Sequence, residues 1–505
     1  MNIAAKPLPD RIEQLQNLII DLRAELAKKD QRIDYLLEQF RLAQQRQFGK
    51  SSEVNPGQLE LFNEAEQIME AEEQSGDEQE TITYQRSKPR RKPLSDSLPR
   101  EQIIHDLNEA DKVCEDCGHD LHCMGEEKSE QLEFIPASIK VIEHIRPKYS
   151  CRHCEQHGIR VNIKIAPVAP AAIPKSLATP SLLSHIITSK YQYALPLYRQ
   201  EALFNQYGIE LSRKTMADWM IKSSRLLHRI YLRLYEILLQ QRVIHADETP
   251  LKVIHVDKNQ SYMWVYCTGS DSPADDPEAP PNIILYDDQN SRAGQCARDY
   301  LGDYSGYLQV DGYAGYQQTK ATLVGCMAHA RRKFIEAQKA QPKGKTGKAD
   351  WAVNHIRTLY RIETELKGKG AQEKYEARQQ QSLPLLEQMK DWLDKSALQV
   401  PPQSAIGKAI AYSLRQWPKL IRYAEDGQLS IDNNRAERAI KPFVMGRKNW
   451  MFANTNNGAH ASAILYSLVE TAKANGLVPF DYIQHLLEEL PKQPEDIDSL
   501  LPWNF

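Results

Sequence analysis

The chain has 505 residues, far above the size at which a single hydrophobic core stops growing, so we expect several domains. Its 41% hydrophobic and 26% charged residues are ordinary for a soluble protein, and no run of about 18 apolar residues predicts a membrane span. The net charge of −3 argues against a uniformly basic nucleic-acid binder, and the N-terminus lacks the apolar core of a secretory signal. We therefore expect a cytoplasmic protein.

A heptad pattern runs through residues 10–48. The two apolar registers consist of Ile12, Ile19, Leu26, Ile33 and Phe40, and of Leu15, Leu22, Lys29, Leu36 and Ala43. The pattern predicts a coiled coil about 48 Å long, in which Lys29 weakens the seam or fixes its register. The alternative is an amphipathic helix that packs on its own protein. We favour a dimer, because no core-forming sequence follows directly.

Residues 49–95 have the composition of a linker that is first acidic and then basic. Residues 64–80 carry eight acids and no Lys or Arg, and residues 86–92 carry five bases and no acid. A basic arm behind an acidic tract suits contact with nucleic acid. For the acidic tract, a solvated linker without a partner is an equally good interpretation.

Two cysteine pairs, "CEDC" and "CRHC", mark residues 96–165 as a zinc ribbon. Four thiolates make a closed tetrahedral zinc site, which is structural rather than catalytic. The intervening sequence alternates apolar and polar residues, as ribbon strands do. The predicted zinc ligands are Cys114, Cys117, Cys151 and Cys154. Residues that offer alternative ligands but fit the paired spacing less well are Cys123, His119, His122 and His153.

Residues 170–240 have a helical pattern with a break at Gly208 and a helix N-cap at Ser212. A helix, a short turn and a second helix suggest a helix-turn-helix. Arg213 and Lys214 begin the second helix, where contacts to bases or phosphates are usual. Many helix pairs bind nothing, so a purely structural pair is the alternative.

The pattern changes to short apolar strands from residue 241. The expected strands are residues 242–247, 262–269, 282–287, 306–311 and 322–327, with a helix near 291–302. Three strands in a meander followed by alternating helix and strand predict a ribonuclease-H-like catalytic core within a multidomain α/β protein. Its first part is 241–330 and its last part 431–476. A helical insertion, 331–430, separates them, and a C-terminal tail follows at 477–505.

Three acids suggest a metal centre. Asp247 and Asp311 each end a predicted strand, and in open α/β sheets such strand ends face the functional crevice. Two carboxylates there repel unless a cation lies between them, and hard oxygen ligands suit Mg²⁺ or Mn²⁺. We expect Glu437 to add a third carboxylate from a helix. Glu248 and Asp432 are nearby competitors, and strand alternation should turn Glu248 to the opposite face.

Glu437 has an alternative role as a helix cap. Asn434, three residues earlier, makes a capping-box pattern with Glu437, and Lys441 is an ion-pair partner at i+4. The surrounding bases fit a DNA backbone that passes a metal site better than they fit a cap. These predicted DNA contacts are Arg435, Arg438, Lys441, Arg447 and Lys448.

The segment "CMAHARRKF" raises a similar question. Cys326 and His329 have the spacing of a zinc half-site, but the sequence offers no second half. We expect His329, Arg331 and Arg332 to begin a helix near the crevice and to contact phosphate. The alternative is a structural histidine with solvent-facing arginines.

The motifs "RQFGKSSE", "CEDC…CRHC", "KYQYALPLYRQ", "LSRKTMADW", "HADETPLKV", "VDGYAGY", "CMAHARRKF", "DNNRAERAIKP" and "LLPWNF", in this order, resemble the transposases of the insertion sequence 66 family. The resemblance covers nearly the whole chain. It implies a DDE transposase with an N-terminal zipper, a zinc domain, a ribonuclease-H-like core and a helical insertion. The family's acids fall on Asp247, Asp311 and Glu437. The resemblance also implies accessory proteins from the same mobile element.

The resulting hypothesis is a transposase that cuts and joins DNA at the ends of an insertion sequence. Two Mg²⁺ or Mn²⁺ ions would serve the phosphoryl transfers and one zinc ion the ribbon. The partners would be element ends, target DNA and at least one further copy of the chain. The alternatives are a dimeric zinc-containing DNA-binding protein with an inactive core, and a metal-dependent nuclease that joins no strands.

Overall fold

The computed structural model describes residues 12–48, 138–150, 152, 156, 163–254, 260–269, 280–341 and 346–505. The predicted linker and all four predicted zinc ligands lie outside the described residues. The chain divides into two units, one of residues 1–73 with 167–505 and one of residues 74–166. In the described part of the smaller unit, β1 (Lys148–Tyr149) pairs antiparallel with β2 (Lys164–Ile165), a strand segment at its boundary.

The predicted N-terminal helix is present as α1 (Ile12–Phe48). Its heptad residues do not belong to a core. The exposed fractions of six of them lie between 49% and 60%, namely those of Ile19, Leu22, Leu26, Ile33, Leu36 and Phe40. An exposed apolar stripe with this spacing is typical of a coiled-coil seam.

Three helices precede the sheet: α5 (Pro180–Tyr191), α6 (Leu197–Gln206) and α7 (Arg213–Leu239). The predicted helix pair is α6 and α7. Between them Gly208 has a φ of 75°, which favours glycine, and the Ser212 hydroxyl caps α7 by accepting from the Thr215 N–H.

A five-stranded mixed sheet forms the centre of the larger unit. Its strands are β3 (Val243–Leu251), β4 (Ser261–Cys267), β5 (Ile284–Gln289), β6 (Tyr307–Gln309) and β7 (Thr322–Val324). Their order is β5-β4-β3-β6-β7. The pairs β3–β4 and β4–β5 are antiparallel, and the pairs β3–β6 and β6–β7 are parallel. The predicted meander is therefore present, and β3 and β6 are neighbours. Helix α8 (Gly294–Leu301) connects β5 to β6.

The prediction that Asp247 ends its strand is wrong. Antiparallel pairing with β4 continues β3 four residues beyond Asp247, to Leu251 opposite Ser261. The parallel pairing of β3 with β6, by contrast, stops at His245 opposite Gln309. Beyond that pair, β3 makes no further ladder hydrogen bonds to β6. Asp247 therefore lies within β3 but past the end of its parallel neighbour.

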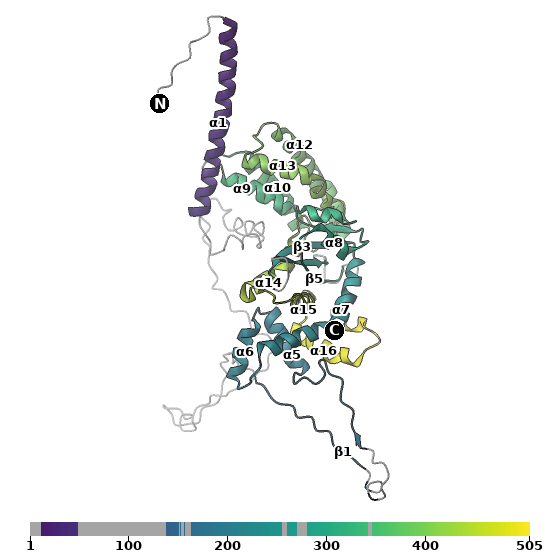
Figure 1. Ribbon diagram of the computed structural model, residues 1–505. Helices are drawn as coiled ribbons and strands as arrows, with labels where there is room; N and C mark the ends of the chain where they lie inside the picture. Colours follow the sequence, from purple (N-terminus) through teal and green to yellow (C-terminus); the bar gives the residue numbers. More distant parts are fainter. Residues whose placement is uncertain are drawn as a thin grey trace, which may run out of the picture. The chain divides into compact units, whose positions relative to one another are not determined.

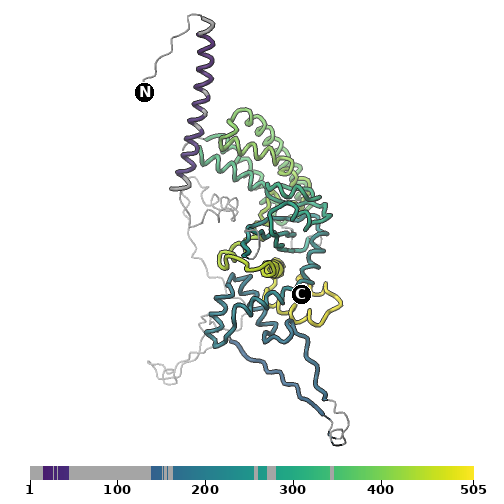
Figure 2. The backbone as a smooth tube through the Cα atoms, in the orientation of Figure 1, coloured from purple at the N-terminus to yellow at the C-terminus, as the bar shows by residue number. Residues whose placement is uncertain are grey.

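The helical insertion consists of α9 (Met327–Lys339), α10 (Lys348–Glu365), α11 (Ala371–Ala377), α12 (Leu383–Ala397) and α13 (Ala405–Leu420), with a π-helical segment at Arg378–Ser382. It has a hydrophobic core of its own, in which Phe334, Ile356 and Met389 are fully buried. Figure 1 shows these helices gathered in green beside the sheet, and Figure 2 traces the chain out into them and back.

The chain returns in α14 (Asn434–Trp450) and α15 (Asn456–Ala474), which pack on β3, β4 and β5 (Figure 1). The segment that we predicted only as a tail folds as α16 (Pro479–Glu489) and short 3₁₀ turns, and α16 packs on α5 with Tyr482 fully buried. Among the described residues, no helix has the length and apolar character to cross a bilayer.

Candidate functional site

Asp247 and Asp311 lie at equivalent positions past the last parallel pair of β3 and β6, Asp247 within β3 and Asp311 two residues beyond the end of β6. The last parallel pair is His245 with Gln309, and each acid follows two residues later. Asp247 shares a face of β3 with His245, and the chain leaves β6 just before Asp311, so both acids lie at the same end of the β3–β6 pair. The tertiary structure therefore brings together two acids that lie 64 positions apart in the sequence.

Electrostatics supports the same grouping. Burial raises the pKa of Asp247 well above its usual range, and the negative charges of Glu248, Asp311 and Glu437 raise it further. The Glu248 N–H, donating to the Asp247 carboxylate at 2.9 Å, opposes that rise. Asp247, Asp311 and Glu437, hereafter the carboxylate trio, thus act on one another's charge, which is the repulsion that a divalent cation relieves.

Glu437 lies in the first turn of α14 but does not cap the helix. The N-cap is Asn433, and among the described residues both Glu437 carboxylate oxygens are buried without a hydrogen-bond partner. Burial raises the pKa of Glu437 to about 7, the charges of Asp432 and Asp311 add to the rise, and the Arg332 and Arg438 charges oppose it. The capping-box interpretation is therefore wrong, and a buried carboxylate with two unsatisfied oxygens is left pointing into the site.

The two competing acids are both occupied. Asp432 accepts hydrogen bonds from the Tyr360 hydroxyl at 2.9 Å and from Asn434, by its amide side chain at 2.7 Å and its N–H at 3.1 Å. Glu248 is held by Arg292 and by the Tyr316 hydroxyl at 2.5 Å. Neither carboxylate has the unsatisfied oxygens of Glu437, which favours Glu437 as the third member.

Asn433 fixes the start of α14 against β3. Its side-chain amide donates to the Ala246 carbonyl at 2.8 Å, and its carboxamide oxygen lies 3.2 Å from His245 Nδ1. Glu437 is one helical turn further on, so these two contacts set its position beside Asp247. Sequence analysis missed this role; the unbroken polar run of "DNN" before the helix was the available signal.

A second network, also missed from the sequence, holds Asp311. The Tyr313 N–H donates to the Asp311 carboxylate at 2.8 Å, and the Arg292 guanidinium lies over the Tyr313 ring at 4.1 Å. Arg292 donates to Glu248 at 2.6 and 2.8 Å, and the charge of Asp311 raises the pKa of Glu248 after burial does. We expected Glu248 to face away from the site. Instead, through Arg292 and the Tyr313 ring, it connects the segment after Asp311 to β3. The tyrosines of "VDGYAGY" were the signal.

The network yields a prediction for Glu248→Gln. Losing the charge that fixes Arg292 loosens the backbone around Asp311, and altering such supporting partners typically weakens metal binding about 10–100-fold. On the hypothesis of Mg²⁺-dependent DNA cleavage, we expect the Mg²⁺ concentration for the half-maximal rate to rise about tenfold, with a smaller change in the rate at saturating Mg²⁺. A metal titration of cleavage measures this.

Glu470→Gln is the matched control, because Glu470 is also buried and paired, with Lys473 at 2.8 Å, but belongs to α15 outside the network. It should leave the metal titration unchanged. Equal titrations for Glu248→Gln and the wild-type protein would refute the positioning role.

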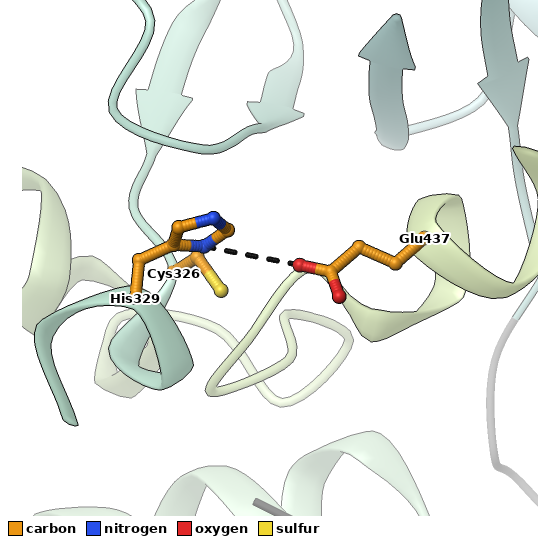
Figure 3. Close-up of side chains that lie close together, drawn as sticks. All are labelled: Cys326, His329 and Glu437. Carbon is orange, nitrogen blue, oxygen red and sulfur yellow. Dashed lines mark ion pairs between the residues drawn. The ribbon is translucent and has the colours of Figure 1, made fainter. Parts of the chain in front are cut away.

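The potential ligand atoms that the described residues bring within 4.8 Å of one another belong to Cys326, His329 and Glu437. Cys326 and His329 come from the junction of β7 with α9, and Glu437 reaches them from α14 (Figure 3). His329 Nδ1 lies 3.8 Å from the Glu437 carboxylate. Burial lowers the pKa of His329 to about 4, and the Arg332 charge lowers it further, so the imidazole is neutral at pH 7.

The predicted DNA contacts are distributed unevenly. Arg331 is a correction: it is 1% exposed and lies near Tyr360, so it is buried in the protein and has no surface for a phosphate to contact. Arg447 donates to the Thr249 hydroxyl at 3.1 Å, and Arg435 lies against Gly269. Arg332 and Lys441 are half-buried, while the exposed candidates are Arg213, Lys214, Arg438 and Lys448.

Comparison with known proteins decides the family. Residues 175–461, more than half of the chain, match the family model described as "Transposase IS66 family". The chain belongs to the IS66 family of transposases. Further models match residues 111–155 ("zinc-finger binding domain of transposase IS66"), 35–103 ("Transposase C of IS166 homeodomain") and 467–503 ("IS66 C-terminal element"). The zinc-finger match over residues 111–155 spans all four predicted zinc ligands, which supports one zinc ion in this IS66 transposase.

Similar chains occur in Sinorhizobium fredii (strain NBRC 101917 / NGR234). "Uncharacterized protein y4jD" is 32% identical over 527 residues, which cover 100% of this IS66 chain and 98% of the relative. "Uncharacterized protein y4qI" is 30% identical over 552 residues, covering 100% and 99%. "Uncharacterized protein y4hP" is 32% identical over 443 residues, covering 84% and 78%. No solved structure matches the chain.

Proposed function

We propose that the protein is a DDE transposase whose carboxylate trio holds two Mg²⁺ or Mn²⁺ ions within a ribonuclease-H-like sheet. The observation that carries the proposal is the pair of unsatisfied, buried Glu437 oxygens in the field of Asp311 and beside a mutually repelling Asp247. Carboxylates so placed fit hard divalent cations. Such ions supply activation of the attacking oxygen and charge stabilisation of the leaving oxygen on phosphorus.

The reaction would consist of two in-line displacements. Water attacks a phosphodiester at the element's end, the bond from phosphorus to the 3′ oxygen breaks, and that oxygen leaves as a 3′-hydroxyl. The 3′-hydroxyl then attacks a phosphodiester of the target DNA, and the target strand gains a new ester bond as its own is broken. No side chain forms a covalent bond in either step. The order of the strands in the sheet and the equivalent register of Asp247 and Asp311 support this assignment.

The helical insertion supports a DNA path to the acids. Lys408, Arg415, Lys419 and Arg422 follow one another at intervals of seven, four and three residues, which places them on one face of α13 and the turn after it. The backbone beyond Asp311 lies directly against this helix, since a Cβ on Gly312 would come within 2.8 Å of the Tyr412 hydroxyl. We propose that this basic stripe contacts DNA phosphates beside the carboxylate trio.

The decisive experiment uses purified full-length protein, labelled DNA that carries an element end, and Mg²⁺. Specific nicking followed by joined products supports a transposase. Nicking without joined products in the presence of the element's accessory proteins favours a nuclease, and binding without any metal-dependent cleavage favours a DNA-binding protein with an inactive core.

We also propose that α1 pairs with α1 of a second copy, because two element ends have to be held together. The exposed apolar heptad supports a zipper, and the family-model match over residues 35–103 begins within the same helix. Lys29 interrupts the seam; it is exposed and lies 3.8 Å from Glu25.

Lys29→Leu is therefore expected to tighten the dimer about tenfold, because a leucine replaces a charged residue in an apolar seam. Sedimentation over a concentration series measures this dissociation constant. Lys28→Leu adds the same side chain one position away, outside the seam, and should have no effect. Unchanged association in Lys29→Leu, or equal effects in both variants, would contradict the zipper.

A further inference from the structure

The fold completes a ligand set that the sequence left incomplete. Cys326 and His329 have the spacing of a zinc half-site, and the chain supplies no second pair nearby. In the structure, Glu437 arrives from 108 positions further along and faces the imidazole of His329 (Figure 3). The three potential ligand atoms lie within 4.8 Å of one another.

These atoms are built into the protein interior. Cys326 is 2% exposed and Glu437 9%, and among the described residues His329 Nδ1 and both Glu437 oxygens lack hydrogen-bond partners. The Asn433 N–H donates to the Cys326 sulfur at 3.3 Å, a contact that favours the thiolate form of a ligand. Buried polar atoms that are left unsatisfied in such proximity indicate a missing partner rather than a packing requirement.

The chemical types of the three ligands select the ion. A thiolate and a neutral imidazole are ligands for Zn²⁺, whereas Mg²⁺ prefers oxygen ligands alone. In a tetrahedral zinc site with bonds of about 2.0–2.3 Å, ligand atoms are about 3.4–3.7 Å apart. The 3.8 Å between His329 Nδ1 and the Glu437 carboxylate already approaches this separation. The bound ion would deprotonate the thiol outright.

We propose that Cys326, His329 and Glu437 bind one Zn²⁺ ion, additional to the zinc of the N-terminal cysteine pairs. A second consequence rests on the proposed function: zinc at this site removes Glu437 from the carboxylate trio. Because sulfur and nitrogen ligands favour Zn²⁺ over Mg²⁺ strongly, micromolar zinc would then inhibit cleavage in the presence of millimolar Mg²⁺.

The direct test is the zinc content of full-length protein that has been saturated with Zn²⁺ and desalted. We expect two zinc ions per chain in the wild type and one in Cys326→Ser and in His329→Ala. Cys296→Ser, which alters a half-buried cysteine outside the cluster, should retain two. Circular dichroism and thermal unfolding identify any variant that fails to fold.

Two results would overturn the site: one zinc ion in the wild type, or equal zinc content in the wild type and both folded cluster variants. The zinc content is independent of cleavage, so a protein that never cleaves DNA would refute the proposed function and leave the zinc site standing.

A second experiment measures inhibition by zinc. The cleavage rate of each variant in added zinc is compared with its own rate without added zinc, at a fixed Mg²⁺ concentration. The wild type and Cys296→Ser should lose at least about 90% of their cleavage in micromolar zinc, and Cys326→Ser should require at least tenfold more zinc for the same loss. Equal sensitivity of wild type and Cys326→Ser would place the inhibitory zinc elsewhere.

Discussion

Asp247→Asn is expected to abolish DNA cleavage and, at the same time, to make the metal-free protein more stable. Asparagine keeps the size of the side chain and an oxygen that can accept from the Glu248 N–H, but it removes one of several neighbouring, mutually repelling charges. Without a full metal site the transition state loses about 4 kcal/mol, which corresponds to about a thousandfold in rate. The melting temperature should rise, because the repulsion with Glu248, Asp311 and Glu437 is relieved.

Asp287→Asn separates the two effects. Asp287 is another half-buried acid of the same sheet, on β5, and burial raises its pKa to about 7, but it does not belong to the carboxylate trio. It should also raise the melting temperature while leaving cleavage unaltered. Nicking of end DNA and thermal unfolding, measured on the same preparations, provide the comparison. An Asp247→Asn protein that still cleaves at more than about a tenth of the wild-type rate would refute the assignment.

Mg²⁺ binding should weaken about tenfold between pH 8 and pH 6. Burial raises the pKa of Glu437 from 4.5 to about 7, so the carboxyl is about 90% protonated at pH 6 and about 90% ionised at pH 8. Protons and Mg²⁺ compete for the same oxygens. A thermal-shift titration with Mg²⁺ at the two pH values gives the half-saturating concentrations.

The same pKa shift determines how the stability of the metal-free protein changes with pH. A carboxyl whose pKa is higher in the folded state than in the unfolded state stabilises the protein below about pH 4.5, and this contribution is lost as the pH rises through about 7. Burial and neighbouring acids shift Asp247 in the same direction. Bound Mg²⁺ should therefore raise the melting temperature by several degrees at pH 8 and by less than half as much at pH 6.

Glu437→Gln provides the control for both statements. The glutamine does not titrate, so the pH dependence that remains must come from other groups, and the tenfold difference in half-saturating Mg²⁺ should shrink. Half-saturating concentrations that are equal at the two pH values in the wild type would show that Glu437 is not a ligand.

Local patterns in the sequence carried much of the secondary structure. The heptad predicted α1, the Gly208 turn and Ser212 cap predicted the α6–α7 junction, and three short apolar runs predicted the meander of β3 to β5. These features depend on hydrophobic periodicity and on turn and cap chemistry, which act over a few residues. The same locality explains the error at β3, whose length was set by pairing with β4 rather than by its own sequence.

The sequence by itself determined the hypothesis for the three acids, since the residue types and the order of the motifs singled out Asp247, Asp311 and Glu437. Only the tertiary structure decided how their neighbours are used. It buried Arg331, satisfied Asp432 and Glu248, left the Glu437 oxygens without partners and brought Cys326 and His329 to them. Burial and hydrogen-bond satisfaction depend on segments from about 40 to more than 100 positions apart, and no local pattern specifies which of several similar polar side chains will be left unpaired.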